Sequence, residues 1–176
     1  MNRLFRASLL VSCLALSACG FHLRQSAALP TSMQHLHLTV NGGGDLQRNL
    51  VRALEDSGVT VEDESGPGVA ELKIPVAQFS TDTLSVSGGA RVTEYTVRYQ
   101  VDFQVDDGNG QALVPQQRID MSRDYSYDAT NTVGNTAQVE EIQRSLNDDM
   151  VQAILFRLQA AGRHQLAEPA AATSAP

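Results

Sequence analysis

Residues 97–105 read VRYQVDFQV, the most regular alternation of apolar and polar side chains in this sequence. The odd-numbered positions are all apolar, and the even-numbered positions are all polar. Because successive side chains of a β-strand point to opposite faces of a sheet, this pattern predicts a strand with one buried and one wet face. The stretch therefore indicates a sheet that is covered on one side only.

The flanking segments predict the elements that build and cover this sheet. Alternating or short apolar runs predict further strands over 34–41, 72–86 and 119–127. Val59 and Val61 could form a small strand of their own. Apolar residues at helical spacing predict helices over 45–57 and 139–161, ended by Gly58 and Gly162.

One predicted strand contains an irregularity. Phe79 falls out of phase with the apolar face that Leu72 and Ile74 begin, and Pro75 removes a donor from the hydrogen-bond ladder. A bulge or an edge position is therefore expected in this strand.

The order of elements predicts the fold class. A strand, a helix, several strands joined by hairpins and a final helix are typical of an α+β fold. We expect both helices to pack on one face of a mixed, mostly antiparallel sheet. Its other face, which carries Arg98, Gln100, Asp102 and Gln104, is polar enough to be solvated or to meet a polar partner.

The N-terminus has the features of an export signal. Arg3 and Arg6 precede an apolar run at 7–16, which small residues separate from Cys19. The run is too short to cross a bilayer, which takes roughly 20 residues. The segment LSAC at 16–19 resembles the lipobox of bacterial lipoproteins, which predicts cleavage after residue 18 and acylation of Cys19; the alternative is an ordinary signal peptide with an accidental cysteine.

This interpretation divides the chain into four parts. We expect a signal peptide at 1–18, a lipidated N-terminus and tether at 19–33, an α+β domain at 34–162 and a disordered tail at 163–176. Loss of the two arginines of the signal takes the formal net charge from −7 to −9. Such a charge disfavours general binding of nucleic acid.

A search for catalytic or metal-binding patterns finds little. His35 and His37 would share one face of a strand, but the sequence supplies no third ligand nearby, so we expect no metal site. There is no Gly-x-Ser-x-Gly motif, no free thiol after lipidation and no recognisable carboxylate pair. We therefore expect no catalytic residues, no enzyme activity and no cofactor.

Several segments carry a resemblance to a known family. They are CGFHLR at 19–24, Leu29-Pro30, Met33, Glu94-Tyr95, RDYSYD at 123–128 and ILFRL at 154–158. Together they resemble LptE, the lipopolysaccharide-assembly lipoprotein family of Gram-negative outer membranes. The resemblance implies two helices on a four-stranded mixed sheet, and a non-enzymatic plug inside the barrel of the outer-membrane protein LptD. It also implies a part in inserting lipopolysaccharide into the outer leaflet.

The resemblance also suggests residues for a lipopolysaccharide contact, since arginine makes charge-assisted bonds to phosphates. Arg91 is the first candidate, because it follows the turn at 87–89 where the family carries a basic residue at a strand tip. Arg123, placed on the polar phase of its strand, and Lys73 are further candidates or else surface or barrel-wall contacts. A second basic position of the family is replaced here by Gly-Asn-Thr at 134–136.

The residue after the predicted acylated cysteine is Gly20 and not aspartate. In this it resembles lipoproteins that are forwarded to the outer membrane.

The sequence also leaves a different class of function open. The chain could be a periplasm-facing lipoprotein that acts as a scaffold or lipid carrier for another envelope machine.

Overall fold

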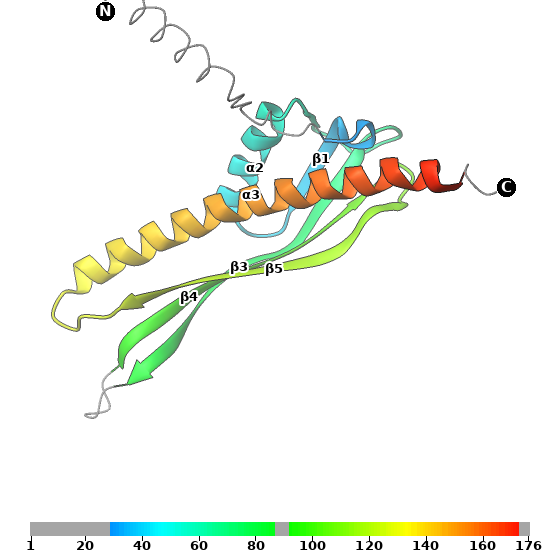
Figure 1. Cartoon of the computed structure of the whole chain (residues 1–176). Helices are drawn as coiled ribbons and strands as arrows, with labels where there is room; N and C mark the ends of the chain where they lie inside the picture. Colours follow the sequence, from blue (N-terminus) through cyan, green and yellow to red (C-terminus); the bar gives the residue numbers. More distant parts are fainter. Residues whose placement is uncertain (1–28, 87–91, 173–176) are drawn as a thin grey trace, which may run out of the picture.

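A computed structural model describes residues 29–86 and 92–172 of the chain as a sheet covered by two helices (Figure 1). The strands are β1 (His35–Val40), β2 (Thr60–Glu62), β3 (Ala70–Val86), β4 (Val92–Asp106) and β5 (Ala112–Ser126). A 3-10 turn, η1 (Thr31–Met33), precedes them, and the helices are α2 (Gly44–Asp56) and α3 (Thr132–Ala172).

The sheet is mixed, as expected, but it has five strands and not four. Their order is β2-β1-β3-β4-β5, with β1 parallel to both of its neighbours and β3, β4 and β5 antiparallel. The additional strand is β2, which pairs with residues 35–37 of β1. This is the small strand that Val59 and Val61 left open; it is only three residues long, and buried Val59 lies just before it.

The alternating stretch at 97–105 forms the centre of β4, as predicted. Its five apolar side chains are all at most 1 % exposed and lie in the single core cluster of the domain. Both helices lie on the same side of the sheet (Figure 1), which confirms the predicted two-layer arrangement. Burial of each such side chain stabilises the fold by about 1.5–3 kcal/mol.

The irregularity predicted in β3 is present. The register between β3 and β4 shifts between Lys73 and Val76, and this places Phe79 opposite Tyr99. Pro75 lies just beyond Ile74, the last residue of β3 that pairs with β1. The C=O of Ile74 accepts from the N–H of Asn41 on the β1 side, so the nitrogen of Pro75 faces β4, where its missing N–H falls within the register shift.

The domain begins earlier than the predicted residue 34. Leu29 is 5 % exposed and Met33 is fully buried, so both belong to the core and not to a tether. The boundary predicted at residue 33 is therefore wrong. Two apolar residues four positions apart, with Pro30 between them, gave no periodic pattern from which this packing could be recognised.

The last helix is longer at both ends than predicted. It begins at Thr132 instead of residue 139 and continues past Gly162 to Ala172, while 173–176 lie outside the described residues. Gly162 is a contact residue and not a stop. An added Cβ there would lie 2.7 Å from two ring carbons of Pro30, so only glycine allows this close approach without a shift.

Candidate functional site

The three cations proposed for a phosphate contact do not form one site. Lys73 pairs with Gln104 in the β3–β4 register, and Arg123 pairs with Val97 in the β4–β5 register. Seven positions of β4 separate these pairs, which is about 24 Å at ~3.4 Å per residue. Arg91 lies outside the described residues.

Lys73 is held between two carboxylates. Its Nζ lies 3.1 Å from Oε2 of Glu71 and 3.0 Å from Oδ2 of Asp106. Hydrogen bonds to Asp106 and Glu71 raise the pKa of Lys73, so its ammonium stays charged but already has anionic partners. A lipid phosphate would have to compete with both carboxylates.

Arg123 lies on the opposite face of β5 from the one predicted. It shares its phase with Ile119, Met121 and Tyr125, and it pairs with Val97, whose side chain is buried under the helices. Its Nη2 lies 2.7 Å from Oδ2 of Asp149 on α3. The assignment of Arg123 to the polar phase is therefore wrong, and the residue bridges strand and helix.

The polar face of the sheet carries cross-strand pairs. Arg118 on β5 donates two hydrogen bonds, of 2.7 and 2.9 Å, to the carboxylate of Asp102 on β4. Arg118 holds the pKa of Asp102 below its usual value. Arg98 on β4 likewise lies 2.8 Å from Asp82 on β3. Because its charges are largely paired, this face suits water or a polar partner surface better than a bare anion.

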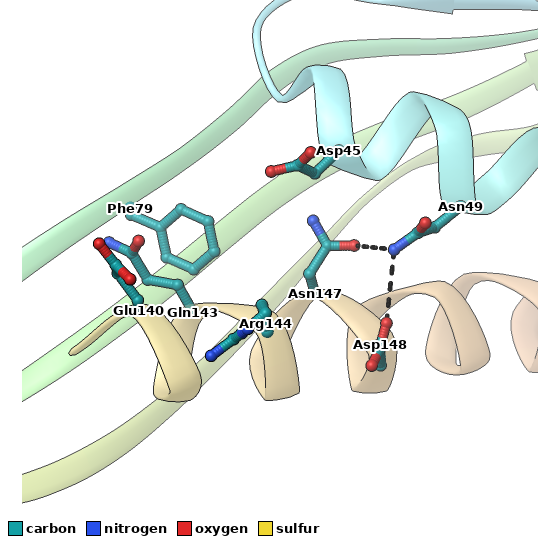
Figure 2. Close-up of a pocket in the computed structure, with 8 residues that line it drawn as sticks. All are labelled: Asp45, Asn49, Phe79, Glu140, Gln143, Arg144, Asn147 and Asp148. Atoms are coloured by element: carbon teal, nitrogen blue, oxygen red, sulfur yellow. Dashed lines mark hydrogen bonds between the residues drawn. The ribbon is translucent and has the colours of Figure 1, made fainter. Parts of the chain in front are cut away.

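A groove of about 490 Å³ opens between α2, α3 and β3 (Figure 2). Its lining consists of Asp45 and Asn49 from α2, Phe79 from β3, and Glu140, Gln143, Arg144, Asn147 and Asp148 from α3. At the end away from Phe79, the Nδ2 of Asn49 donates to Oδ1 of Asn147 at 3.3 Å and of Asp148 at 3.4 Å. These bonds join the two helices and close that end.

The apolar end of the groove is formed by Phe79, which stacks on a buried tyrosine outside the lining. The Phe79 ring is parallel to that of Tyr99, with centroids 3.9 Å apart. Tyr99 is 1 % exposed and its hydroxyl has no hydrogen-bond partner among the described residues, whereas Phe79 is 37 % exposed. Burial, together with the negative charge of Asp45, raises the pKa of Tyr99 to about 12.

Tyr99→Phe should make the domain more resistant to alkali. The folded pKa of about 12 exceeds the unfolded value of about 10, so the folded state keeps a proton that the unfolded state loses. Stability is thus intact below pH 10 and falls between pH 10 and 12, by about 2–3 kcal/mol in total. Urea unfolding at pH 8, 10 and 11 should show this loss in the wild type and in Tyr127→Phe, and a smaller loss in Tyr99→Phe, to which Lys73 and Tyr125 still contribute because their pKa values are also raised. An equal alkaline loss in Tyr99→Phe would contradict this assignment.

Sequence patterns alone did not indicate the groove. Phe79 is out of phase in the sequence, but Asn49, Asn147 and Asp148 are ordinary helix residues until the two helices are placed beside each other.

The two histidines of β1, His35 and His37, contact other groups in the structure. Nδ1 of His35 lies 2.8 Å from Oε1 of Glu62, and no group of three potential ligands occurs in the described part of the chain.

Comparison with known proteins now decides the family. A sequence model described as "LptE: Lipopolysaccharide-assembly" matches residues 33–158, which include all five strands and most of α3. The chain belongs to the LptE family. None of the helices among the described residues is long and apolar enough to span a bilayer.

Relatives of this LptE-family chain match most of its length, and a solved structure shares its fold. It is 25 % identical over 177 residues to the LPS-assembly lipoprotein LptE of Photorhabdus laumondii, covering 97 % of each chain. It is 24 % identical to the protein of the same name from Yersinia enterocolitica, covering 89 % of this chain and 76 % of that one. The solution structure of an uncharacterized lipoprotein B from Nitrosomonas europaea matches with a TM-score of 0.69 at 25 % identity, covering 80 % and 91 %.

Proposed function

We propose that this chain is a non-enzymatic lipoprotein of the outer membrane that plugs the LptD barrel and assists its assembly. In that position it takes part in transporting lipopolysaccharide to the outer leaflet. The observation that carries the proposal is the family match over residues 33–158, together with relatives of similar length named for lipopolysaccharide assembly.

The anchor in this proposal is Cys19. Each buried methylene contributes about 0.8 kcal/mol to membrane binding, and two or more acyl chains make the attachment stable. Residues 20–28 would then connect the anchor to Leu29, where the packed domain begins. Such a short connection keeps the domain close to the membrane.

The packing of the core supports a plug over the alternative of a lipid carrier. A carrier needs an apolar cavity for acyl chains, whereas the inward-facing side chains of β4 are fully or almost fully buried against the helices. The groove in Figure 2 is open and is lined mostly by polar side chains. A domain with this interior suits contact with a barrel through its outer surface.

Depletion of the protein from its own cells tests this function. We expect lipopolysaccharide at the cell surface to fall, newly made lipopolysaccharide to accumulate inside, and the amount of mature LptD barrel to fall with it. An unrelated outer-membrane barrel serves as the control and should be unaffected. Normal surface lipopolysaccharide after depletion would contradict the proposal.

Arg91 leads the candidates for a lipopolysaccharide contact, because Lys73 and Arg123 both have carboxylate partners. We predict that Arg91→Glu weakens binding of the purified protein to lipopolysaccharide about tenfold, as expected when one charge-assisted bond is lost. The matched control is Arg48→Glu on the exposed surface of α2, which should bind normally. Equal binding by Arg91→Glu and the wild type would place the contact elsewhere.

A further inference from the structure

Part of β3 has a strand partner on one side only. β1 pairs with β3 only up to Ile74, and the loop after β1 passes beside Ala77, close to Gly42 and Gly43. From residue 78 to 83, β3 continues to pair with β4, and Leu84 lies in a register shift, but no strand pairs with the other side of residues 78–84 among the described residues. We call residues 78–84 the open edge.

The open edge presents unused backbone groups. In an antiparallel pair, alternate residues direct their N–H and C=O groups away from the partner strand. Such a row of free donors and acceptors can bind an extended peptide as an additional strand, and proteins usually protect it with charges or proline.

The edge of β5 and the open edge of β3 differ in this protection. Over its length, β5 carries Pro115, Arg118, Asp120, Arg123 and Asp124. The open edge contains a single charged residue, Asp82, and no proline. The edge of β5 is therefore guarded against strand addition, whereas the open edge is not.

The groove lies beside the open edge, since Phe79 belongs to both. A strand added here would place apolar side chains against the exposed part of the Phe79 ring. Farther along β3, Leu84 is 52 % exposed and offers a second apolar contact.

The groove also specifies the charge of its occupant. Asp45 is paired with Arg48, and Arg144 lies 2.6 Å from Glu141. Glu140 and Asp148 then give the lining an excess of negative charge. A basic side chain of the added segment would neutralise this excess.

We propose that the open edge and the groove together bind one extended segment of a partner protein by β-strand addition. The segment carries an apolar side chain that packs on Phe79 and a basic side chain that faces Glu140 and Asp148. This inference rests on the proposed function, because the partner on which it is tested is the LptD barrel.

Two serines give a matched pair of variants for the test. Ser80 on β3 and Ser122 on β5 both lie opposite Arg98 of β4 in the sheet register, and both are exposed. Ser80→Lys places a charge on the open edge, and Ser122→Lys places the same charge on the guarded one. Urea unfolding of the two variants checks that both remain folded.

We expect Ser80→Lys to reduce the barrel that co-purifies with the tagged full-length lipoprotein about tenfold, whereas Ser122→Lys retains it. Amide hydrogen exchange of the wild type, free and in the complex, gives the second readout. About half of the amides of residues 78–84 should exchange more slowly in the complex, since alternate N–H groups face the added strand.

The outcomes separate the two proposals. If the barrel co-purifies with the wild type but the open edge gains no protection and Ser80→Lys binds as well as Ser122→Lys, this inference alone is overturned. If no barrel co-purifies with the wild type, the proposed function is overturned and this inference with it.

Discussion

Alanine in place of Phe103 should lower the free energy of unfolding by about 3–5 kcal/mol. Phe103 is fully buried at the centre of the sheet face that both helices cover. Removing its ring takes away the free energy of burial and leaves a cavity that the surrounding strands cannot fill by relaxing. Urea unfolding of the soluble domain, followed by circular dichroism, measures the change.

A second phenylalanine provides the control for this prediction. Phe156 on α3 is 58 % exposed, so Phe156→Ala should cost well under half as much as Phe103→Ala. A loss below about 1 kcal/mol for Phe103→Ala would show that the core is not tightly packed. That result would favour the lipid-carrier alternative over the plug.

Cys19→Ala should release the protein from the membrane without unfolding it. The cysteine is the predicted acylation site, and the packed domain begins ten residues later, at Leu29. Acyl chains on this cysteine are the proposed anchor, so replacing it removes the attachment. Fractionation of cells should find the variant in the soluble fraction, with unchanged circular dichroism after purification.

The second cysteine of the sequence is the matched control. Cys13 lies in the segment predicted to be removed, so Cys13→Ala should leave attachment to the membrane unchanged. Continued membrane attachment of Cys19→Ala would refute the lipid anchor, and failure of that variant to fold would refute the separation of anchor and domain.

The parts of the fold that could be predicted are those with repeated local signals. Residues 97–105 specify a half-buried strand through nine alternating positions, and the stripes of apolar residues specify α2 and the middle of α3. Pro75 and the phase of Phe79 were enough to predict the bulge in β3, because each has a direct effect on backbone pairing. Each of these features is determined by residues that lie close together in the sequence.

The errors arose where distant contacts decide the structure. Gly162 has the appearance of a helix end, but Pro30, more than a hundred residues away, packs against it and the helix continues. The count of four strands was wrong because the short segment around Val61 finds a parallel partner in β1 and becomes a fifth strand, β2.

Arg123 has the phase of Ile119 and Tyr125 in β5, so alternation along the strand places it on the covered face and not on the wet one. The groove depends on the mutual placement of α2, α3 and β3, for which a single sequence offers no signal.

The central claim is that this lipoprotein resides inside a barrel, and its purification from the outer membrane tests that claim directly. The tagged protein is solubilised in detergent, captured and washed stringently, and the proteins that remain bound are identified by mass spectrometry. The account predicts one barrel protein, LptD, in a near-stoichiometric amount. Recovery of the lipoprotein alone, or with a periplasmic partner in place of a barrel, would contradict it.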